Sequence, residues 1–211
     1  MAQKRPANPL ALAVLGCLYE RPMHPYEMAS VLRTRGKDSS IKINYGSLYT
    51  VVDSLQRRKL IEPRETQREG RRPERTVYRL TNQGRVSLVD WLSDMISQPV
   101  KEFTQFEAAL SFLAVLPPEE VAELLQERVG LLDLEIHQLR AVLGMTIERK
   151  LPRLFTVETE YWLMLREAEL AWVRELADEI AEGRLDSMNM WREIQREIDE
   201  RHEAEGAGEM S

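Results

Sequence analysis

Residues 44–59 combine an apolar stripe and a polar face with the period of a helix. Leu48, Val51, Val52 and Leu55 stand at i, i+3, i+4 and i+7, so a helix here has one apolar face. The opposite face carries hydroxyl groups, a phenol and a cation, which suit contact with a polyanion. A surface helix without a partner explains the apolar stripe equally well, so the interpretation depends on the segments that follow.

We expect the polar face of this helix to contact DNA. Asn44 can cap the first turn, and Gly46 leaves room for the close approach of a ligand. The N-terminus of a helix carries a partial positive charge that favours phosphate. Tyr49 has an alternative position, packed inward. The candidate contacts are Asn44, Tyr45, Gly46, Ser47, Tyr49, Thr50, Ser54 and Arg57.

Two β-competent segments follow, residues 61–66 and 75–80, with Gly70 and Pro73 between them. Because Gly and Pro punctuate turns, this pattern predicts a hairpin with a long tip. A helix followed by a hairpin with a basic tip is typical of a winged helix-turn-helix, whose helix enters the major groove and whose wing lies over phosphates or the minor groove. The candidate wing contacts are Arg68, Arg71, Arg72 and Arg75.

The preceding segment predicts the rest of a small domain. Asn8 and Pro9 form a cap followed by proline at the first helical position, and residues 10–19 are nearly all apolar, so they should form a central helix. Cys17 lies in this helix, and a buried thiol acting as a small hydrophobe is favoured over a redox switch.

A second helix should cover residues 25–34, and residues 41–43 alternate as a short strand beside the wing would. The inward-facing candidates are Met28, Val31 and Leu32, with Tyr26 or Ala29 beside them. The nearby cations could contact phosphates or could equally be ordinary solvated charges. They are Arg33, Arg35, Lys37 and Lys42.

The second half of the chain predicts long helices. Thr81 should cap a helix to about Ile96, with Val86, Leu88, Val89, Trp91 and Leu92 for burial. Longer helices are expected over residues 118–150, 156–182 and 186–202. In the first, Val121, Leu125, Val129, Leu132, Ile136, Leu139 and Leu143 form a seam like that of a coiled coil. In the second, the expected face is Tyr161, Leu165, Ala168, Trp172 and Leu176, and in the third it is Met190, Trp191, Ile194 and Ile198.

The fold should therefore be mainly α. Residues 1–96 form a winged helix-turn-helix with a two-stranded wing, residues 97–203 a helical dimerisation domain, and residues 204–211 a frayed tail. The long helices can pair as an antiparallel hairpin and against the same hairpin of a second chain, because winged-helix regulators bind palindromic operators as two-fold dimers. The alternative is a monomeric helical bundle.

Charge divides the chain in the same way. Residues 1–92 hold 17 Lys and Arg against 9 Asp and Glu, a net charge of +8, and the remainder holds 12 against 26, a net charge of −14. Such asymmetry separates a nucleic-acid module from an acidic partner module. No apolar run approaches the ~18 residues that cross a bilayer, and a single cysteine allows no intrachain disulfide, so a cytoplasmic protein is expected.

Enzyme chemistry has little support in the sequence. Asp133 and His137 stand at i, i+4 on a helix, but no further ligand at metal spacing accompanies them, and an ordinary acidic helix face is favoured. There is no glycine-rich phosphate loop, nucleophile elbow or H-E-x-x-H motif. We expect no catalytic residues, metal or cofactor.

The sequence also resembles the PadR-like transcriptional regulators, over about the first ninety residues. Residues 25–28 (PYEM) resemble that family's G-Y-E-L, residues 45–49 (YGSLY) its G-T-[IL]-Y, and residues 72–84 (RPERTVYRLTNQG) its P-R-K-x-Y-x-L-T-x-x-G. Leu55, Leu60 and Ile61 resemble the hydrophobic run that ends in G-L-I. Pro25, Thr50 and Lys59 depart from the pattern, which affects the expected helix ends and not the class.

The resemblance implies a dimeric, DNA-binding repressor, some of whose relatives accept aromatic compounds. An effector of that kind needs an apolar pocket with stacking faces. The candidate pocket residues are Trp91, Phe103, Phe106, Trp162 and Trp172, which could line a cleft between the two domains or simply fill the core. The alternative function is a winged-helix module that binds proteins without reading DNA.

Overall fold

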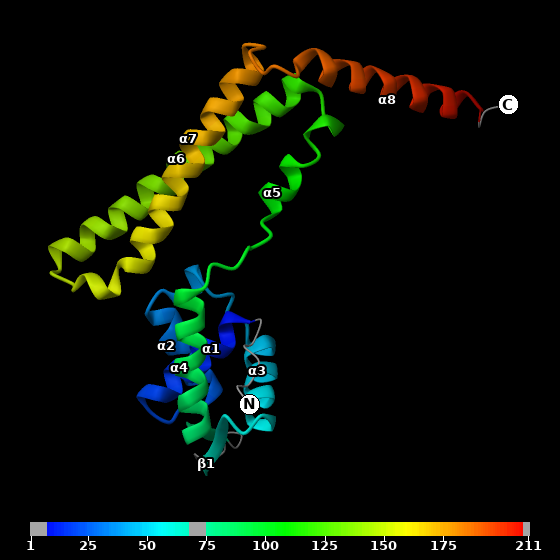
Figure 1. Cartoon of the computed structure of the whole chain (residues 1–211). Helices are drawn as coiled ribbons and strands as arrows, with labels where there is room; N and C mark the ends of the chain where they lie inside the picture. Colours follow the sequence, from blue (N-terminus) through cyan, green and yellow to red (C-terminus); the bar gives the residue numbers. More distant parts are fainter. Residues whose placement is uncertain (1–7, 68–74, 209–211) are drawn as a thin grey trace. The chain divides into compact units, whose positions relative to one another are not determined.

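The computed structural model describes residues 8–67 and 75–208 and divides the chain into two compact units, Met1–Lys101 and Glu102–Ser211. Figure 1 shows the chain with its α-helices and strand β1 labelled. The first unit contains α1 (Pro9–Glu20), α2 (Pro25–Thr34), the 3-10 turn η1 (Lys37–Ser39), α3 (Tyr45–Arg57), β1 (Ile61–Gln67), β2 (Arg75–Leu80) and α4 (Asn82–Ser97). The predicted fold class, mainly helical with a two-stranded wing, is confirmed.

Helix α1 is the centre of the first unit and contacts α2, α3, α4 and β2. Asn8 caps it as predicted, because its Oδ1 accepts the backbone N–H of Leu10 at 2.9 Å, and Pro9 is the first helical residue. Val14 and Leu15 are fully buried, and Cys17 is 3% exposed. The thiol therefore packs as a small hydrophobe, and burial raises its pKa to about 11.

Helix α2 follows its predicted bounds, and Val31, expected to face inward, is half-buried against the core. Met28, Ala29 and Leu32 are buried, whereas Tyr26 is 55% exposed. Tyr26 and Ala29 were the two alternatives for the residue beside this inward face, and Ala29 is the one that is buried. Tyr26 lies in the first turn of α2 on the opposite side from Met28.

The wing is an antiparallel pair in which Ile61 stands opposite Leu80 and Glu62 opposite Arg79, with an irregularity between Pro63 and Glu65. Pro63 has no N–H for the ladder, which accounts for a bulge at this point. The predicted short strand at residues 41–43 is wrong, since those residues are irregular.

Beside the wing, the turn before α2 supplies an isolated bridge instead. The N–H of Met23 donates to the carbonyl of Tyr78 at 3.1 Å, and that of Tyr78 donates to the carbonyl of Met23 at 2.9 Å.

Helix α4 begins at the predicted cap, where the Thr81 hydroxyl accepts the N–H of Gly84 at 3.0 Å. Its buried side carries Ser87, Leu88 and Trp91. The expectation that Val86, Val89 and Leu92 are also buried was wrong: they are 54%, 54% and 44% exposed. The helix has apolar residues on two faces, and only one of them meets α1.

The second unit is a helical assembly of α5 (Gln105–Leu110), the 3-10 turns η2 (Leu113–Val115) and η3 (Arg153–Phe155), α6 (Pro118–Glu148), α7 (Val157–Ala181) and α8 (Met188–Gly208). Helices α6 and α7 lie side by side as an antiparallel hairpin (Figure 1). The α6 seam predicted from Val121 to Ile136 is buried, and its later members Leu139 and Leu143 are half-buried.

In α7 the buried stripe is Leu170, Val173, Ala177 and Ile180. Of the face predicted for this helix, Leu165 and Leu176 are half-buried, whereas Tyr161 and Trp172 are 60% and 47% exposed. Both stripes have helical spacing, and α6 packs on the smaller side chains.

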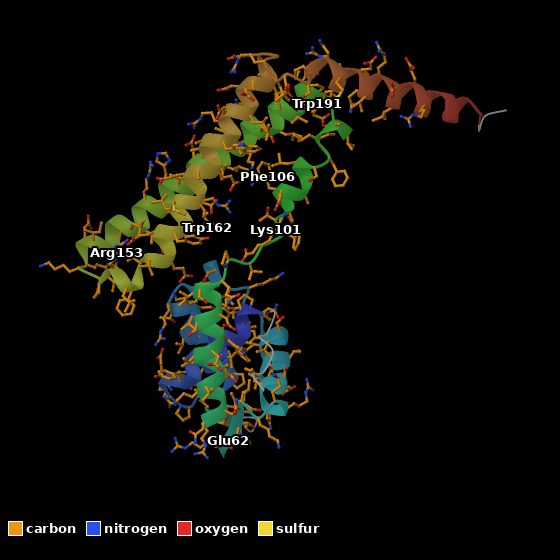
Figure 2. The ribbon with its side chains drawn as sticks, in the orientation of Figure 1. Glu62, Lys101, Phe106, Arg153, Trp162 and Trp191 are labelled. Atoms are coloured by element: carbon orange, nitrogen blue, oxygen red, sulfur yellow. The ribbon has the colours of Figure 1, made fainter. Side chains whose placement is uncertain are left out.

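Helix α8 is held by its first turns. The indole N–H of Trp191 donates to the carbonyl of Leu116 at 3.0 Å, and Trp191 is 6% exposed (Figure 2). Met188 is also buried, whereas Met190, expected on the apolar face, is 60% exposed. The helix continues to Gly208, so residues 204–208 are helical where a frayed tail was expected.

Candidate nucleic-acid interface

Helix α3 is fixed to the first unit by the stripe that its sequence predicts. Leu48, Val51, Val52 and Leu55 are all buried. The Oδ1 of Asn44 accepts the N–H of Ser47 at 2.7 Å and caps the helix as expected.

The C-terminus of α3 is a Schellman motif. The N–H of Leu60 donates to the carbonyl of Leu55 at 3.0 Å, and the N–H of Lys59 donates to that of Gln56 at 2.8 Å. Lys59 itself has a positive φ of 59°.

The opposite face of α3 presents the predicted contacts to solvent. Tyr45 and Tyr49 are 39% and 51% exposed, so Tyr49 does not occupy the alternative, inward position. Asn44, Gly46, Thr50 and Arg57 are exposed, and Ser47 and Ser54 are half-buried. The Thr50 hydroxyl donates to the carbonyl of Gly46 at 2.9 Å, which leaves its lone pairs outward.

Two residues of α2 join this face: Arg33, which the sequence offered as a possible phosphate contact, and Tyr26, which was considered only for the inward side of the helix. The ring of Tyr26 stacks on the ring of Tyr45, with centroids 5.6 Å apart and planes 6° from parallel. Arg33 Nη1 donates to the Tyr45 hydroxyl at 3.0 Å, and its guanidinium carbon lies 4.9 Å from the centroid of the Tyr45 ring. Tyr26 and Arg33 are seven residues apart, a spacing that places both on one side of a helix and could have linked them.

Two other cations of the first unit, Arg35 and Arg79, are paired with carboxylates. Arg35 donates to both carboxylate oxygens of Glu20, at 2.5 and 2.8 Å, and this hydrogen bonding lowers the pKa of Glu20 and raises the pKa of Arg35. Arg79 pairs with Glu62 across the wing at 2.7 Å. Of the cations for which the sequence left two alternatives, Arg35 is paired with Glu20 and Arg33 contacts Tyr45 of α3.

The wing tip lies outside the described residues. That holds for Arg68, Arg71 and Arg72, whereas Arg75 is the first residue of β2 in backbone terms. Within the described part of the wing, Arg64 is exposed at the irregularity between the strands. The four wing arginines remain predicted contacts.

The five aromatic residues proposed for an effector pocket have different surroundings. Trp91 is 2% exposed in the core of the first unit, with the Arg58 guanidinium 5.0 Å from its ring centroid. Phe103, Phe106, Trp162 and Trp172 belong to the second unit.

Of these four, Phe106 and Trp172 meet edge to face with centroids 6.3 Å apart. Trp162 lies nearer the start of α7, where its indole donates to Glu135 at 2.8 Å (Figure 2), and Phe103 is 88% exposed.

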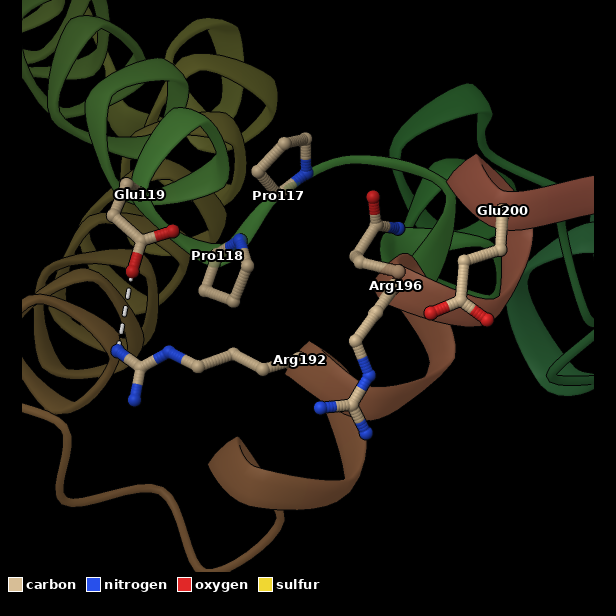
Figure 3. A pocket seen from close by; sticks show the side chains of 7 residues that line it. Pro117, Pro118, Glu119, Arg192, Arg196 and Glu200 are labelled. Carbon is tan, nitrogen blue, oxygen red and sulfur yellow. Dashed lines mark hydrogen bonds and ion pairs between the residues drawn. The ribbon is translucent and has the colours of Figure 1, made fainter. Parts of the chain in front are cut away.

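Two of the hollows formed by the described residues bear on the site. An apolar groove of about 490 Å³ in the first unit is lined by α1, the end of α2 and α4, including Leu12, Gly16, Tyr19 and Leu92. A pocket of about 470 Å³ in the second unit lies between the start of α6 and α8 (Figure 3). There Arg192 donates to Glu119 at 3.1 Å, so its charge braces the two helices.

The pair considered for a metal is engaged in ordinary contacts. His137 Nδ1 lies 2.6 Å from the carbonyl oxygen of Asp133, and the Asp133 carboxylate pairs with Arg174 at 3.0 Å. Within the described residues, no group of three or more His, Cys, Asp or Glu side chains is placed to hold a metal ion. Those residues also contain no helix with the length and apolarity to cross a membrane.

Comparisons with known proteins agree with this architecture. The crystal structure of Bacillus subtilis PadR in complex with operator DNA is 20% identical, with a TM-score of 0.64 over 82% of this chain and 99% of that chain. The same protein in complex with p-coumaric acid is 18% identical, with a TM-score of 0.62 over 82% of this chain and 98% of that chain. The Vibrio cholerae virulence activator AphA is 19% identical, with a TM-score of 0.60 over 82% of this chain and 98% of that chain.

These likenesses show a shared fold, and no curated protein matches the chain. The family described as transcriptional regulator PadR-like matches residues 14–90, which span α1 to α4 and contain the motifs quoted above. Those residues therefore match the PadR-like family of transcriptional regulators, and the resemblance seen in the sequence is confirmed over this part of the chain.

Proposed function

We propose that this chain is a sequence-specific DNA-binding regulator that reads an operator with the polar face of α3 and contacts neighbouring phosphates with its wing. The observation that carries the proposal is the two-sided character of α3, whose apolar side is buried while Tyr45, Tyr49 and Thr50 are exposed. A helix held in this way presents its first turns rigidly, as recognition helices do. The complex of Bacillus subtilis PadR with operator DNA supports the same use of this fold.

A mobility shift with the DNA upstream of the protein's own gene, across a salt series, tests the proposal. Binding through phosphates predicts that affinity falls steeply as salt rises, and competition with unrelated DNA measures specificity. The alternative, a winged-helix module that binds proteins, predicts no retardation of the operator fragment at any salt concentration.

We further propose that the regulator is a dimer joined through the α6–α7 hairpin. Five exposed apolar residues of α6, at 124, 131, 134, 142 and 145, lie within one face of the helix by their spacing, whereas exposed Ile147 lies off that face. On α7, Tyr161, Met164 and Trp172 form a second exposed stripe. Contiguous apolar faces of this kind mark protein interfaces, and a second copy would also supply the two recognition helices that a palindrome requires.

Sedimentation of a double variant, Leu131→Asp with Met164→Asp, tests the dimer. The expected result is a folded monomer with weakened operator binding. Met190→Asp is the matched control, because Met190 is 60% exposed on α8, outside both stripes, and should leave the mass unchanged. A dimer that survives the double substitution would contradict this interface.

We also propose that the regulator is a repressor, and that a small aromatic ligand relieves the repression. The structure of Bacillus subtilis PadR with p-coumaric acid supports a ligand of this class, while AphA is described as an activator. The Phe106–Trp172 contact offers stacking faces, although aromatics at such positions also serve simply as packing.

Fluorescence titration with phenolic acids distinguishes a ligand site at Phe106 and Trp172 from simple packing of the two rings. Quenching in the wild type that is lost in Trp172→Phe supports the ligand site, with Trp91→Phe as the buried control. Unchanged emission and unchanged operator binding at millimolar ligand would exclude this chemical class.

A further inference from the structure

We propose that Tyr45, oriented by Arg33 and Tyr26, is a phosphate-binding phenol, and that α2 thereby contributes to the DNA interface. This inference rests on the proposed function of α3. It adds Tyr26 and Arg33 of α2 to the proposed DNA interface, and Arg33 also contributes a positive charge. The contact is with the phosphodiester backbone and not with the bases.

The hydrogen bonding of the Tyr45 hydroxyl gives the first argument. A phenol has one O–H donor and two acceptor lone pairs. Arg33 Nη1 donates to this oxygen at 3.0 Å, and a guanidinium cannot accept a hydrogen bond in return. The Tyr45 proton must therefore point to another acceptor, and the side chain is 39% exposed on the outer face of α3.

The charge of Arg33 gives the second argument. Among the described residues, Arg33 bonds to two neutral oxygens, the Tyr45 hydroxyl and the carbonyl of Ile43 at 3.4 Å. The contrast is with Arg35 and Arg79, which are paired with carboxylates. A cation that donates to a phenol polarises its O–H and strengthens it as a donor. The pair therefore offers an anion both a hydrogen bond and a positive charge.

The Tyr26 ring supplies the rigidity. It lies nearly parallel to the Tyr45 ring, at 5.6 Å, and covers one face of it, while the Arg33 guanidinium lies 4.9 Å from the centroid of the same ring. Aromatic and cation–π contacts of this type restrict the phenol to one orientation. Tyr26 and Arg33 act here as positioning residues, and Tyr45 makes the contact.

The location on the fold identifies the ligand. In a helix-turn-helix the second helix lies in the major groove and the first crosses the sugar-phosphate backbone. Tyr45 is the first residue of α3, and its two supports come from α2, the first helix of the motif. A donor at this junction is placed for a phosphate at the edge of the groove. The ordinary alternative is a surface cluster that only braces α2 against α3.

The experiment compares full-length variants by fluorescence anisotropy with an operator duplex and an unrelated duplex, each across a salt series. Tyr45→Phe keeps the stack and removes the hydroxyl, so it should weaken binding to both duplexes about fivefold. Arg33→Gln should lower the salt slope by about 0.9, the value for one phosphate contact. The double variant should lose less than the product of the two single effects, because one contact is shared.

The controls are Tyr19→Phe and Arg85→Gln. This exposed pair on α1 and α4 has the same type of contact, with the guanidinium carbon 4.8 Å from the ring centroid, and it lies outside the proposed surface. The control variants should bind as the wild type does.

Thermal melting separates binding from bracing. Tyr45→Phe with wild-type affinity, or Arg33→Gln with an unchanged salt slope, overturns the phosphate contact even if the melting temperature falls. A wild-type protein that binds neither duplex overturns the proposed function as well, so the two failures are distinguishable.

Discussion

Gly84 lies directly against the carbonyl of Leu60: a Cβ at Gly84 would stand 2.0 Å from that oxygen. The contact joins the first turn of α4 to the turn between α3 and the wing. The same carbonyl accepts the N–H of Thr81 at 3.1 Å, so the backbone there has little room to withdraw. A glycine is required at this position for close approach and not for an unusual backbone angle.

Gly84→Ala should therefore destabilise the winged-helix unit by about 2 kcal/mol or more, as overpacking of a tight contact does. Urea denaturation of the two proteins measures the difference. Gly16→Ala in α1 is the matched control, since a Cβ there meets nothing within 4 Å, and it should stabilise by about 0.5–1 kcal/mol. Equal effects of the two substitutions would contradict the close packing at Gly84.

Lys59→Gly should stabilise the protein by about 0.5–1 kcal/mol, because lysine occupies the left-handed position of the Schellman motif with φ 59°. Lys59→Ala removes the same charge and retains the strained backbone, so it should give no gain in the free energy of unfolding. The same comparison applies at Lys150, where φ is 53°. A stabilising alanine would point to charge and not to backbone strain.

Tyr49→Phe should lower operator affinity severalfold and leave the melting temperature unchanged. The physical reason is that Tyr49 is 51% exposed, so its hydroxyl is available to DNA while its loss leaves no cavity. Calorimetry and anisotropy on the same preparation test both halves. Normal affinity together with a lower melting temperature would reject a role in DNA contact.

The wing arginines should supply sequence-independent attraction. A double Arg71→Ala, Arg72→Ala variant should reduce the salt slope by about 1.8, two contacts at about 0.9 each. A double Arg192→Ala, Arg196→Ala variant in α8 is the control, since it makes the same change in net charge within the second unit. If the wing variant retains the full slope, the tip does not contact phosphates.

Cys17 should resist thiol reagents in the folded protein. With its pKa raised to about 11 by burial, about one thiol in a thousand is ionised at pH 8, and the thiolate is the reactive form. Labelling with a chromogenic disulfide should become fast only in denaturant.

The raised pKa of Cys17 also determines how the stability of the fold changes with pH. The pKa of the folded thiol lies above its ordinary value of 9.0, so the unfolded chain ionises first. Stability should fall as pH rises from about 9 towards 11, and Cys17→Ala should remove that component. An unaltered pH profile in Cys17→Ala would contradict this assignment.

The sequence predicted best where one apolar stripe has one possible partner. Leu48, Val51, Val52 and Leu55 fit a single face, and this face is buried. Helices α4 and α7 each carry apolar residues on more than one side, so periodicity alone could not distinguish Val89 from Leu88 or Trp172 from Val173. In each case the buried side is determined by the neighbouring helix, which is a tertiary property.

Tyr26 was not assigned to the candidate interface for a related reason. The stacking of Tyr26 on Tyr45 depends on how α2 crosses α3, and no local pattern reports that crossing. The charge of Arg33 was visible in the sequence, but its neutral partners were not. Helix periodicity could at most have shown that Tyr26 and Arg33 share a side of α2.

The bridge between Met23 and Tyr78 has a mechanical consequence. Because Tyr78 also belongs to the ladder with β1, the base of β2 has backbone neighbours on both sides. A foreign strand cannot add there, which removes one route to aggregation. The bridge also ties the wing to the turn that starts α2, so tilting the wing as a whole would break two backbone hydrogen bonds. The base of the wing and the turn that starts α2 are therefore held together and should move as one rigid piece.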